Sequence, residues 1–110
     1  MFKKSPFYKI KTSVPLNYAQ PVREAMSQAG AGKQGNYINC SGSYSITGRF
    51  TPIKGAKPTI GSQGKEEVVK EEAIEMLCHK NKIKAVIKAL KKAHPYEEPP
   101  IDIFERIDIK

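Results

Sequence analysis

The chain has 110 residues, of which 39% are hydrophobic and 27% charged, and its 19 basic residues outnumber its 11 acidic ones. This length and composition are typical of one globular domain, and they exclude collagen-like, disulfide-rich and intrinsically disordered chains. We therefore expect a single domain over residues 1–110. No apolar run is long enough for a membrane span, and no secretory segment follows the N-terminal lysines. These features favour a cytoplasmic protein in which Cys40 and Cys78 are reduced.

Apolar periodicity predicts the elements of the first half of the chain. Alternating apolar and polar residues predict a first strand over residues 7–14. Helical spacing predicts a short amphipathic helix over residues 18–29, followed by Gly30 at the position where helices favour glycine. Alternation returns over residues 43–51 and predicts a second strand, in which Gly48 indicates a bulge or a close contact.

The second half of the chain begins with a long loop. Residues 52–65 hold three glycines, two prolines and three lysines without periodicity, and loops of this length are often functional or mobile. A third strand is expected over residues 66–78, where Cys78 shares the apolar side and is expected in the core. Residues 80–93 form the clearest helical pattern, with an apolar stripe opposite a solvated face of lysines. Alternation predicts a fourth strand over residues 101–109.

The order strand, helix, strand, strand, helix, strand is the split β-α-β arrangement (βαββαβ) of ferredoxin-like α+β folds. We expect an antiparallel four-stranded sheet with two helices on one face. The opposite face would carry both charged and apolar side chains, namely Lys9, Lys11, Glu71, Glu75, Val69, Leu77 and Phe104. Such a mixed face is poorly suited to bare solvent and indicates burial against other subunits.

The heptapeptide HPYEEPP at residues 94–100 is the most unusual segment of the chain. Its three prolines restrict the backbone and are expected to hold His94, Tyr96, Glu97 and Glu98 in a rigid turn. An imidazole beside two carboxylates can bind a divalent metal or perform acid–base chemistry. In the alternative interpretation, Tyr96 packs on the core, His94 caps the helix and the glutamates offset nearby lysines.

Motifs in a fixed order along the chain resemble the PII/CutA-like domain that is inserted into many Nif-three-like (Ngg-interacting-factor-three-like) proteins. They include Gly35-Asn36-Tyr37, Gly48-Arg49-Phe50-Thr51-Pro52, Gly55-Ala56-Lys57-Pro58 and His94-Pro95-Tyr96-Glu97-Glu98-Pro99. The HPYE stretch is also similar to the end of CutA, a trimeric divalent-cation tolerance protein, although Glu98 departs from that pattern. The resemblance covers nearly the whole chain. It implies a ferredoxin-like fold, assembly as a homotrimer and ligand clefts between subunits, with residues 52–65 in the place of the ligand-binding loop of PII.

The preferred function is a non-catalytic trimer that binds a small ligand or a divalent metal cofactor. Tyr96 and the loop lysines, which suit an anionic ligand, are the candidate ligand contacts: Lys54, Lys57 and Lys65. The candidate metal ligands are His94, Glu97, Glu98 and Cys40.

Two alternatives remain open beside it. One is an enzyme that uses His94 and Glu97, with Cys40 as the nucleophile. The other is nucleic-acid binding through the lysine-rich helix over residues 80–93. That helix contains no aromatic residue, which disfavours nucleic-acid binding, because single strands are commonly held by stacking on aromatic side chains.

Overall fold

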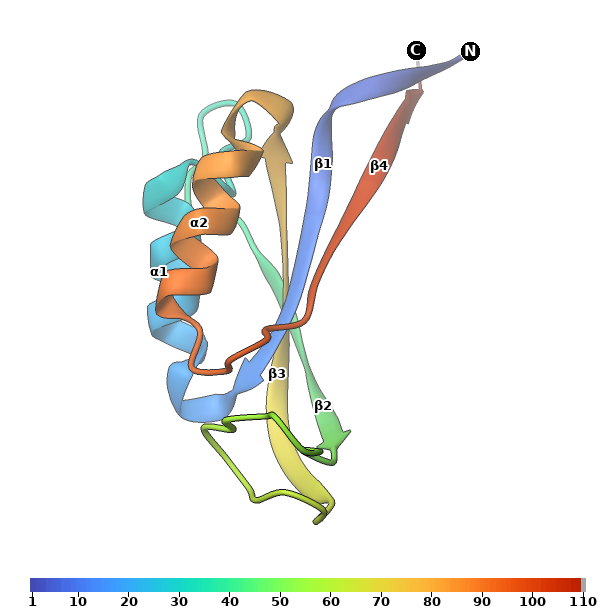
Figure 1. The fold of residues 1–110 in the computed structure, drawn as a ribbon. Helices are drawn as coiled ribbons and strands as arrows, with labels where there is room; N and C mark the ends of the chain where they lie inside the picture. The colour runs from blue at the N-terminus through green and yellow to red at the C-terminus, as the bar shows by residue number, and fades with distance from the viewer. Residues whose placement is uncertain (110) are drawn as a thin grey trace.

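The computed structural model describes residues 1–109 and confirms the predicted ferredoxin-like fold. Its elements follow the order β1 (Phe2–Pro15), α1 (Ala19–Ala29), β2 (Gly42–Phe50), β3 (Glu67–His79), α2 (Ile83–Ala93) and β4 (Ile101–Ile109). Short 3-10 turns, Leu16–Tyr18 and Lys80–Lys82, precede the two helices. The strands form one antiparallel sheet in the order β2-β3-β1-β4, and both helices cover the same face of it (Figure 1).

The helix-facing side of the sheet and the apolar stripes of both helices make the core. Its fully buried side chains come from β1, α1, β3 and α2, and include Ile10, Val14, Val22, Met26, Ile74, Val86 and Leu90. Cys78 is buried among them, as the alternation in β3 predicted. Gly30 ends α1 with a φ of 122°, which confirms its predicted role, because residues with a side chain rarely adopt that conformation.

The first strand begins earlier than the sequence predicted. β1 starts at Phe2 because β4 folds back along it and pairs Phe2 with Ile109 and Lys4 with Ile107. The register of this pairing shifts between Lys4 and Tyr8. The paired ends of β1 and β4 extend beyond the rest of the sheet, and Phe2 and Ile109 lie side by side there (Figure 1).

The face of the sheet that turns away from the helices mixes charge with apolar surface, as predicted. Lys9 Nζ lies 3.3 Å from a carboxylate oxygen of Glu75, and the Tyr44 hydroxyl donates a 3.2 Å hydrogen bond to the same carboxylate. Phe104 pairs with Lys9 across β1 and β4 and remains 48% exposed. Neither helix within residues 1–109 has the length and apolarity that crossing a bilayer requires.

Candidate functional site

The turn after α2 is anchored to the sheet through His94. The ring nitrogen Nδ1 accepts a 3.1 Å hydrogen bond from the Tyr96 backbone N–H, so the proton of the neutral ring resides on Nε2. Nε2 in turn donates to the Ser13 carbonyl of β1 at 2.7 Å. Burial lowers the pKa of His94 and keeps the imidazole neutral. Both ring nitrogens are thus engaged by the backbone.

Tyr96 reaches from this turn to a buried carboxylate on β3. Its hydroxyl donates a 2.5 Å hydrogen bond to Glu71 Oε2, although the Glu71 residue is only 5% exposed. Burial, together with the hydrogen bond and the charge of Glu71, raises the pKa of Tyr96 well above its usual range. The Phe50 ring at the end of β2 packs edge-on against the Tyr96 ring, with 5.7 Å between centroids.

The lack of a side chain at Gly48 leaves room for the Glu71 carboxylate. Gly48 pairs with Val69 on β3, next to Glu71, and a Cβ at this position would collide with Oε1 of Glu71. The sequence indicated either a bulge or a close contact at Gly48, and the structure shows the close contact. Glu71 itself was expected only on the outer sheet face, and its contact with Tyr96 was not predicted.

The loop between β2 and β3, residues 51–66, is hydrogen-bonded to the same turn. The Lys57 backbone N–H donates to Glu97 Oε1 at 3.0 Å, and the Thr59 hydroxyl donates to the Pro95 carbonyl at 2.6 Å. Two segments almost forty residues apart in sequence therefore form one unit.

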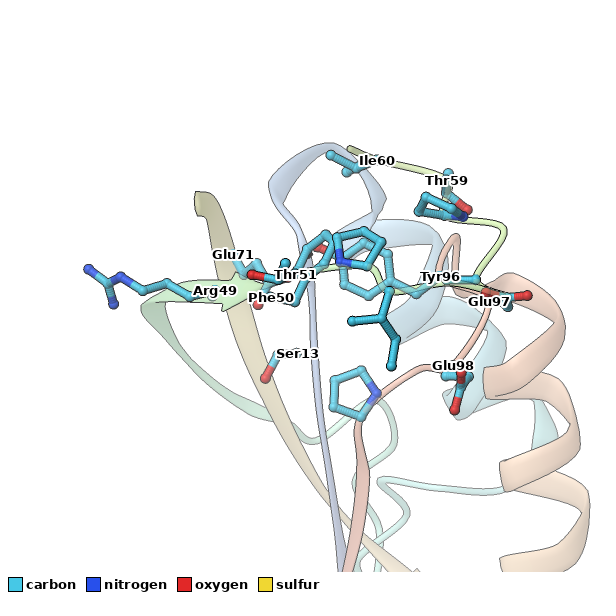
Figure 2. A pocket seen from close by; sticks show the side chains of 16 residues that line it. Ser13, Arg49, Phe50, Thr51, Thr59, Ile60, Glu71, Tyr96, Glu97 and Glu98 are labelled. Atoms are coloured by element: carbon cyan, nitrogen blue, oxygen red, sulfur yellow. Dashed lines mark hydrogen bonds between the residues drawn. The ribbon is translucent and has the colours of Figure 1, made fainter. Parts of the chain in front are cut away.

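A cavity of about 510 Å³ lies between this loop, the turn and the end of β2 (Figure 2). Most of its walls are apolar or aromatic, with Phe50, Pro52, Ile53, Pro58, Ile60 and Tyr96 among the lining residues. Hydroxyl groups come from Ser13, Thr51 and Thr59, and charged groups from Arg49, Glu71, Glu97 and Glu98. A cavity of this size, mainly apolar with a few polar groups, is typical of small-molecule sites.

The structure brings together only some of the residues that the sequence singled out. Tyr96, Glu97 and Glu98 line the cavity, and His94 packs behind Tyr96 with 5.0 Å between ring centroids. The candidate ligand-binding lysines are exposed and do not line it: Lys54, Lys57 and Lys65. Lys57 contributes its backbone amide to the turn rather than its ammonium group to the cavity.

Cys40 lies at the other end of the helical layer. Its backbone N–H donates to the Gly32 carbonyl, and the Gly32 N–H donates to Leu77 near the end of β3, whereas His94 bonds to Ser13 at the opposite end of the strands (Figure 1). The candidate set of His94, Glu97 and Cys40 is therefore not assembled as a catalytic group. Within residues 1–109, no group of three or more His, Cys, Asp or Glu side chains is placed to hold a metal ion.

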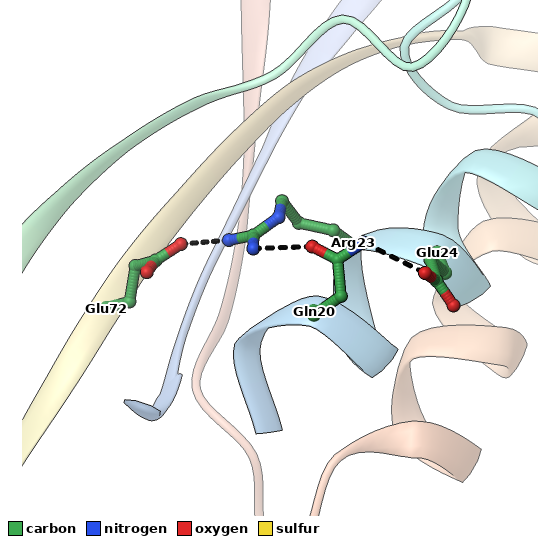
Figure 3. A network of polar contacts seen from close by, with 4 residues as sticks. All are labelled: Gln20, Arg23, Glu24 and Glu72. Atoms are coloured by element: carbon green, nitrogen blue, oxygen red, sulfur yellow. Dashed lines mark hydrogen bonds and ion pairs between the residues drawn. The ribbon is translucent and has the colours of Figure 1, made fainter. Parts of the chain in front are cut away.

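A separate polar network joins α1 to β3 (Figure 3). Arg23 forms an ion pair with Glu72, and its second terminal nitrogen donates a 2.7 Å hydrogen bond to Gln20 Oε1. The amide nitrogen of Gln20 donates in turn to Glu24 at 2.8 Å. Because the charge of Arg23 is matched by Glu72, this network serves to position α1 on the sheet.

Comparison with known proteins confirms the resemblance that the motifs indicated. No family model matches the chain. A Bacillus subtilis protein named GTP cyclohydrolase 1 type 2 homolog is 44% identical over 99 residues, which are 90% of this chain and 26% of the relative. A Mycobacterium tuberculosis protein of the same name is 44% identical over 91 residues, or 83% of this chain and 24% of the relative. The chain thus spans about a quarter of the length of the curated relatives it matches.

Comparison with solved structures finds similarity to the same kinds of protein. A Bacillus cereus protein related to NIF3 has a TM-score of 0.79 and 36% identity, over 96% of this chain and 26% of that one. The divalent cation tolerance protein CutA of Archaeoglobus fulgidus has a TM-score of 0.64 and 20% identity, over 89% of this chain and 81% of that one. The likeness to CutA shows the fold alone.

Proposed function

We propose that this PII/CutA-like relative of the Nif-three-like proteins is a non-catalytic domain that binds a small organic molecule in the cavity between residues 51–66 and residues 94–100. The observation that carries the proposal is the cavity of about 510 Å³, whose two walls are hydrogen-bonded to each other. Hydrogen bonds of buried His94 and half-buried Tyr96 fix the turn, so one wall is preorganised. Preorganised walls lower the entropic cost of binding.

The contacts of His94 favour an organic ligand over a divalent metal. A metal at His94 needs one ring nitrogen free, and binding it would break the hydrogen bond to either Ser13 or Tyr96. Glu97 already accepts a backbone N–H from Lys57. Metal binding by the turn therefore requires rearrangement, whereas an organic ligand in the cavity would leave these contacts of His94 in place.

The same contacts favour binding over catalysis. His94 Nε2 faces the Ser13 carbonyl rather than its hydroxyl, so no hydroxyl nucleophile is activated by this imidazole. The curated relatives carry the name of a cyclohydrolase homolog, but this chain corresponds to about a quarter of their length. We assign the chain no share of such an activity.

We further propose that the domain assembles as a homotrimer, as the resemblance to CutA implies. The mixed outer face of the sheet and the projecting ends of β1 and β4 support assembly. Phe2, Ile107 and Ile109 at these ends are 74%, 64% and 79% exposed, and association of copies would remove this apolar surface from water.

Nuclear magnetic resonance of the isotopically labelled protein tests the binding proposal. Titration with a small-molecule fragment library is expected to shift the backbone amides of residues 48–60 and 96–98 together, since they surround one cavity. Amides of α2 serve as the internal reference. Fragment-induced shifts that gather elsewhere, or nowhere, would contradict the proposed site.

A further inference from the structure

The charges around the cavity differ from those of the chain as a whole. The protein has 19 basic and 11 acidic residues, yet the cavity is lined by three carboxylates, those of Glu71, Glu97 and Glu98. Its only lining residue with a positive charge is Arg49, and Figure 2 shows the guanidinium group directed away from the cavity. The cavity is therefore acidic within a basic protein.

Among the residues that the structure describes, none forms an ion pair with these three carboxylates. The ion pairs among residues 1–109 join Lys4 to Glu105, Lys9 to Glu75, Arg23 to Glu72 and Arg106 to Asp108. Glu71 and Glu97 accept hydrogen bonds only from neutral donors, the hydroxyl of Tyr96 and a backbone N–H. His94 does not supply the charge, because its buried ring is held neutral by its two backbone contacts.

Burial makes the position of Glu71 the most informative of the three. A carboxylate that is 5% exposed is costly to keep without a compensating cation, and buried charges are normally paired. Oε2 receives the Tyr96 hydroxyl, while Oε1 lies against the small surface of Gly48. The arrangement keeps a carboxylate in the wall of a mainly apolar cavity.

We infer that the cavity selects an organic cation, with an apolar or aromatic body packed against the Phe50–Tyr96 pair and an ammonium or guanidinium group beside a lining carboxylate, that of Glu71, Glu97 or Glu98. This inference rests on the proposed binding function and narrows it to a ligand class. It replaces the anionic ligand that the loop lysines suggested, because those lysines do not line the cavity. The edge-to-face pair of Phe50 and Tyr96 also offers aromatic surface to a cation.

Three indole probes of similar size but different charge test the inference: tryptamine, the neutral tryptophol and the anionic indole-3-acetate. Binding is measured by calorimetry and by amide shifts at low ionic strength and neutral pH. Tryptamine is expected to bind about tenfold or more tightly than tryptophol, because a charge-assisted hydrogen bond distinguishes them. Indole-3-acetate is expected to bind more weakly than tryptophol.

Two variants test whether the cavity carboxylates cause the preference for the cationic probe, and a third variant is the control. Glu98→Gln and Glu71→Gln each remove one cavity charge, and the Glu71→Gln amide oxygen still accepts the Tyr96 hydroxyl. Glu66→Gln removes a charge from an exposed residue that does not line the cavity. The affinity for tryptamine should fall several-fold in the first two variants and stay unchanged in the third.

The outcomes distinguish a failure of cation selectivity from a failure of small-molecule binding in the cavity. Equal binding of all three probes at the cavity, or a preference for indole-3-acetate, overturns selection of a cation and leaves the binding function standing. Tryptamine affinity that does not respond to Glu98→Gln and Glu71→Gln also overturns the inference. No shift at the cavity amides with any probe at millimolar concentration overturns both.

Discussion

Tyr96 and Glu71 meet through a 2.5 Å hydrogen bond from the phenol to a carboxylate that is almost fully buried. The bond joins the turn after α2 to β3, and it places one aromatic side chain and one charge in the wall of the same cavity. It is therefore both a structural anchor and part of the proposed binding surface.

Replacing Tyr96 by Phe should lower the free energy of unfolding by about 1 to 3 kcal/mol, because a buried carboxylate loses its hydroxyl donor. The matched control is Tyr44→Phe, which removes a 3.2 Å hydrogen bond to Glu75 from an exposed part of the sheet. Its effect should be about 0.5 kcal/mol or less. Urea denaturation measures both, and equal losses in the two variants would show that the Tyr96 bond has no special role.

Gly48→Ala should destabilise the protein by about 1 to 3 kcal/mol, because its Cβ would collide with the Glu71 carboxylate. Gly42→Ala lies on the same strand, and nothing lies within 4 Å of the added Cβ there, so little change is expected. Thermal denaturation compares the pair. A Gly48→Ala protein as stable as Gly42→Ala would mean that Glu71 moves aside freely.

The stability of the protein should depend on pH through His94. Folding lowers the pKa of this ring because burial disfavours the imidazolium ion. The neutral ring therefore makes its full contribution to the free energy of unfolding above about pH 6.5. The contribution is lost as the pH falls through the lower pKa of the folded state. Protonating Nδ1 also breaks the hydrogen bond from the Tyr96 N–H.

His94→Asn isolates this effect, since an amide oxygen can accept the Tyr96 N–H but does not titrate. Unfolding free energies at pH 7.5 and 5.5 should differ less in the variant than in the parent protein. The same pH dependence in both proteins would assign it to other groups.

Light scattering should give a mass three times the 12.3 kDa of the chain. Phe104→Lys places a charge on the mixed outer face and should shift the mass toward that of the monomer. The control is Val68→Lys, at a residue of similar exposure that points to the helix side of the sheet. A monomeric parent protein, or identical behaviour of the two variants, would contradict assembly through this face.

Periodicity predicted the elements and the two faces of the sheet because it reflects local burial. The burial of Cys78 and the placement of Lys9 and Glu75 on the same outer face followed from it. The early start of β1 was missed because Pro6 and the flanking lysines do not alternate, and the strand forms there through pairing with β4.

The cavity was only partly predictable. The prolines of residues 94–100 indicated a rigid turn, and Tyr96, Glu97 and Glu98 do line the cavity. The contact of Glu71 with Tyr96 depends on the register of β3 and on the path of a turn 25 residues later, which no local pattern encodes. The path of the 51–66 loop likewise presents the amide of Lys57, rather than its charge, to Glu97.

The most direct test of the account is the binding of an indole probe to a protein whose cavity has been filled. Ala56→Trp places a large side chain on a residue that lines the cavity, and Ala85→Trp places the same side chain on an exposed position of α2. Titration with the tightest-binding indole probe, followed at the amides of Phe50 and Tyr96, should show shifts in the parent protein and in Ala85→Trp, and none in Ala56→Trp. Unchanged affinity in a folded Ala56→Trp protein would contradict the assignment of this cavity as the binding site.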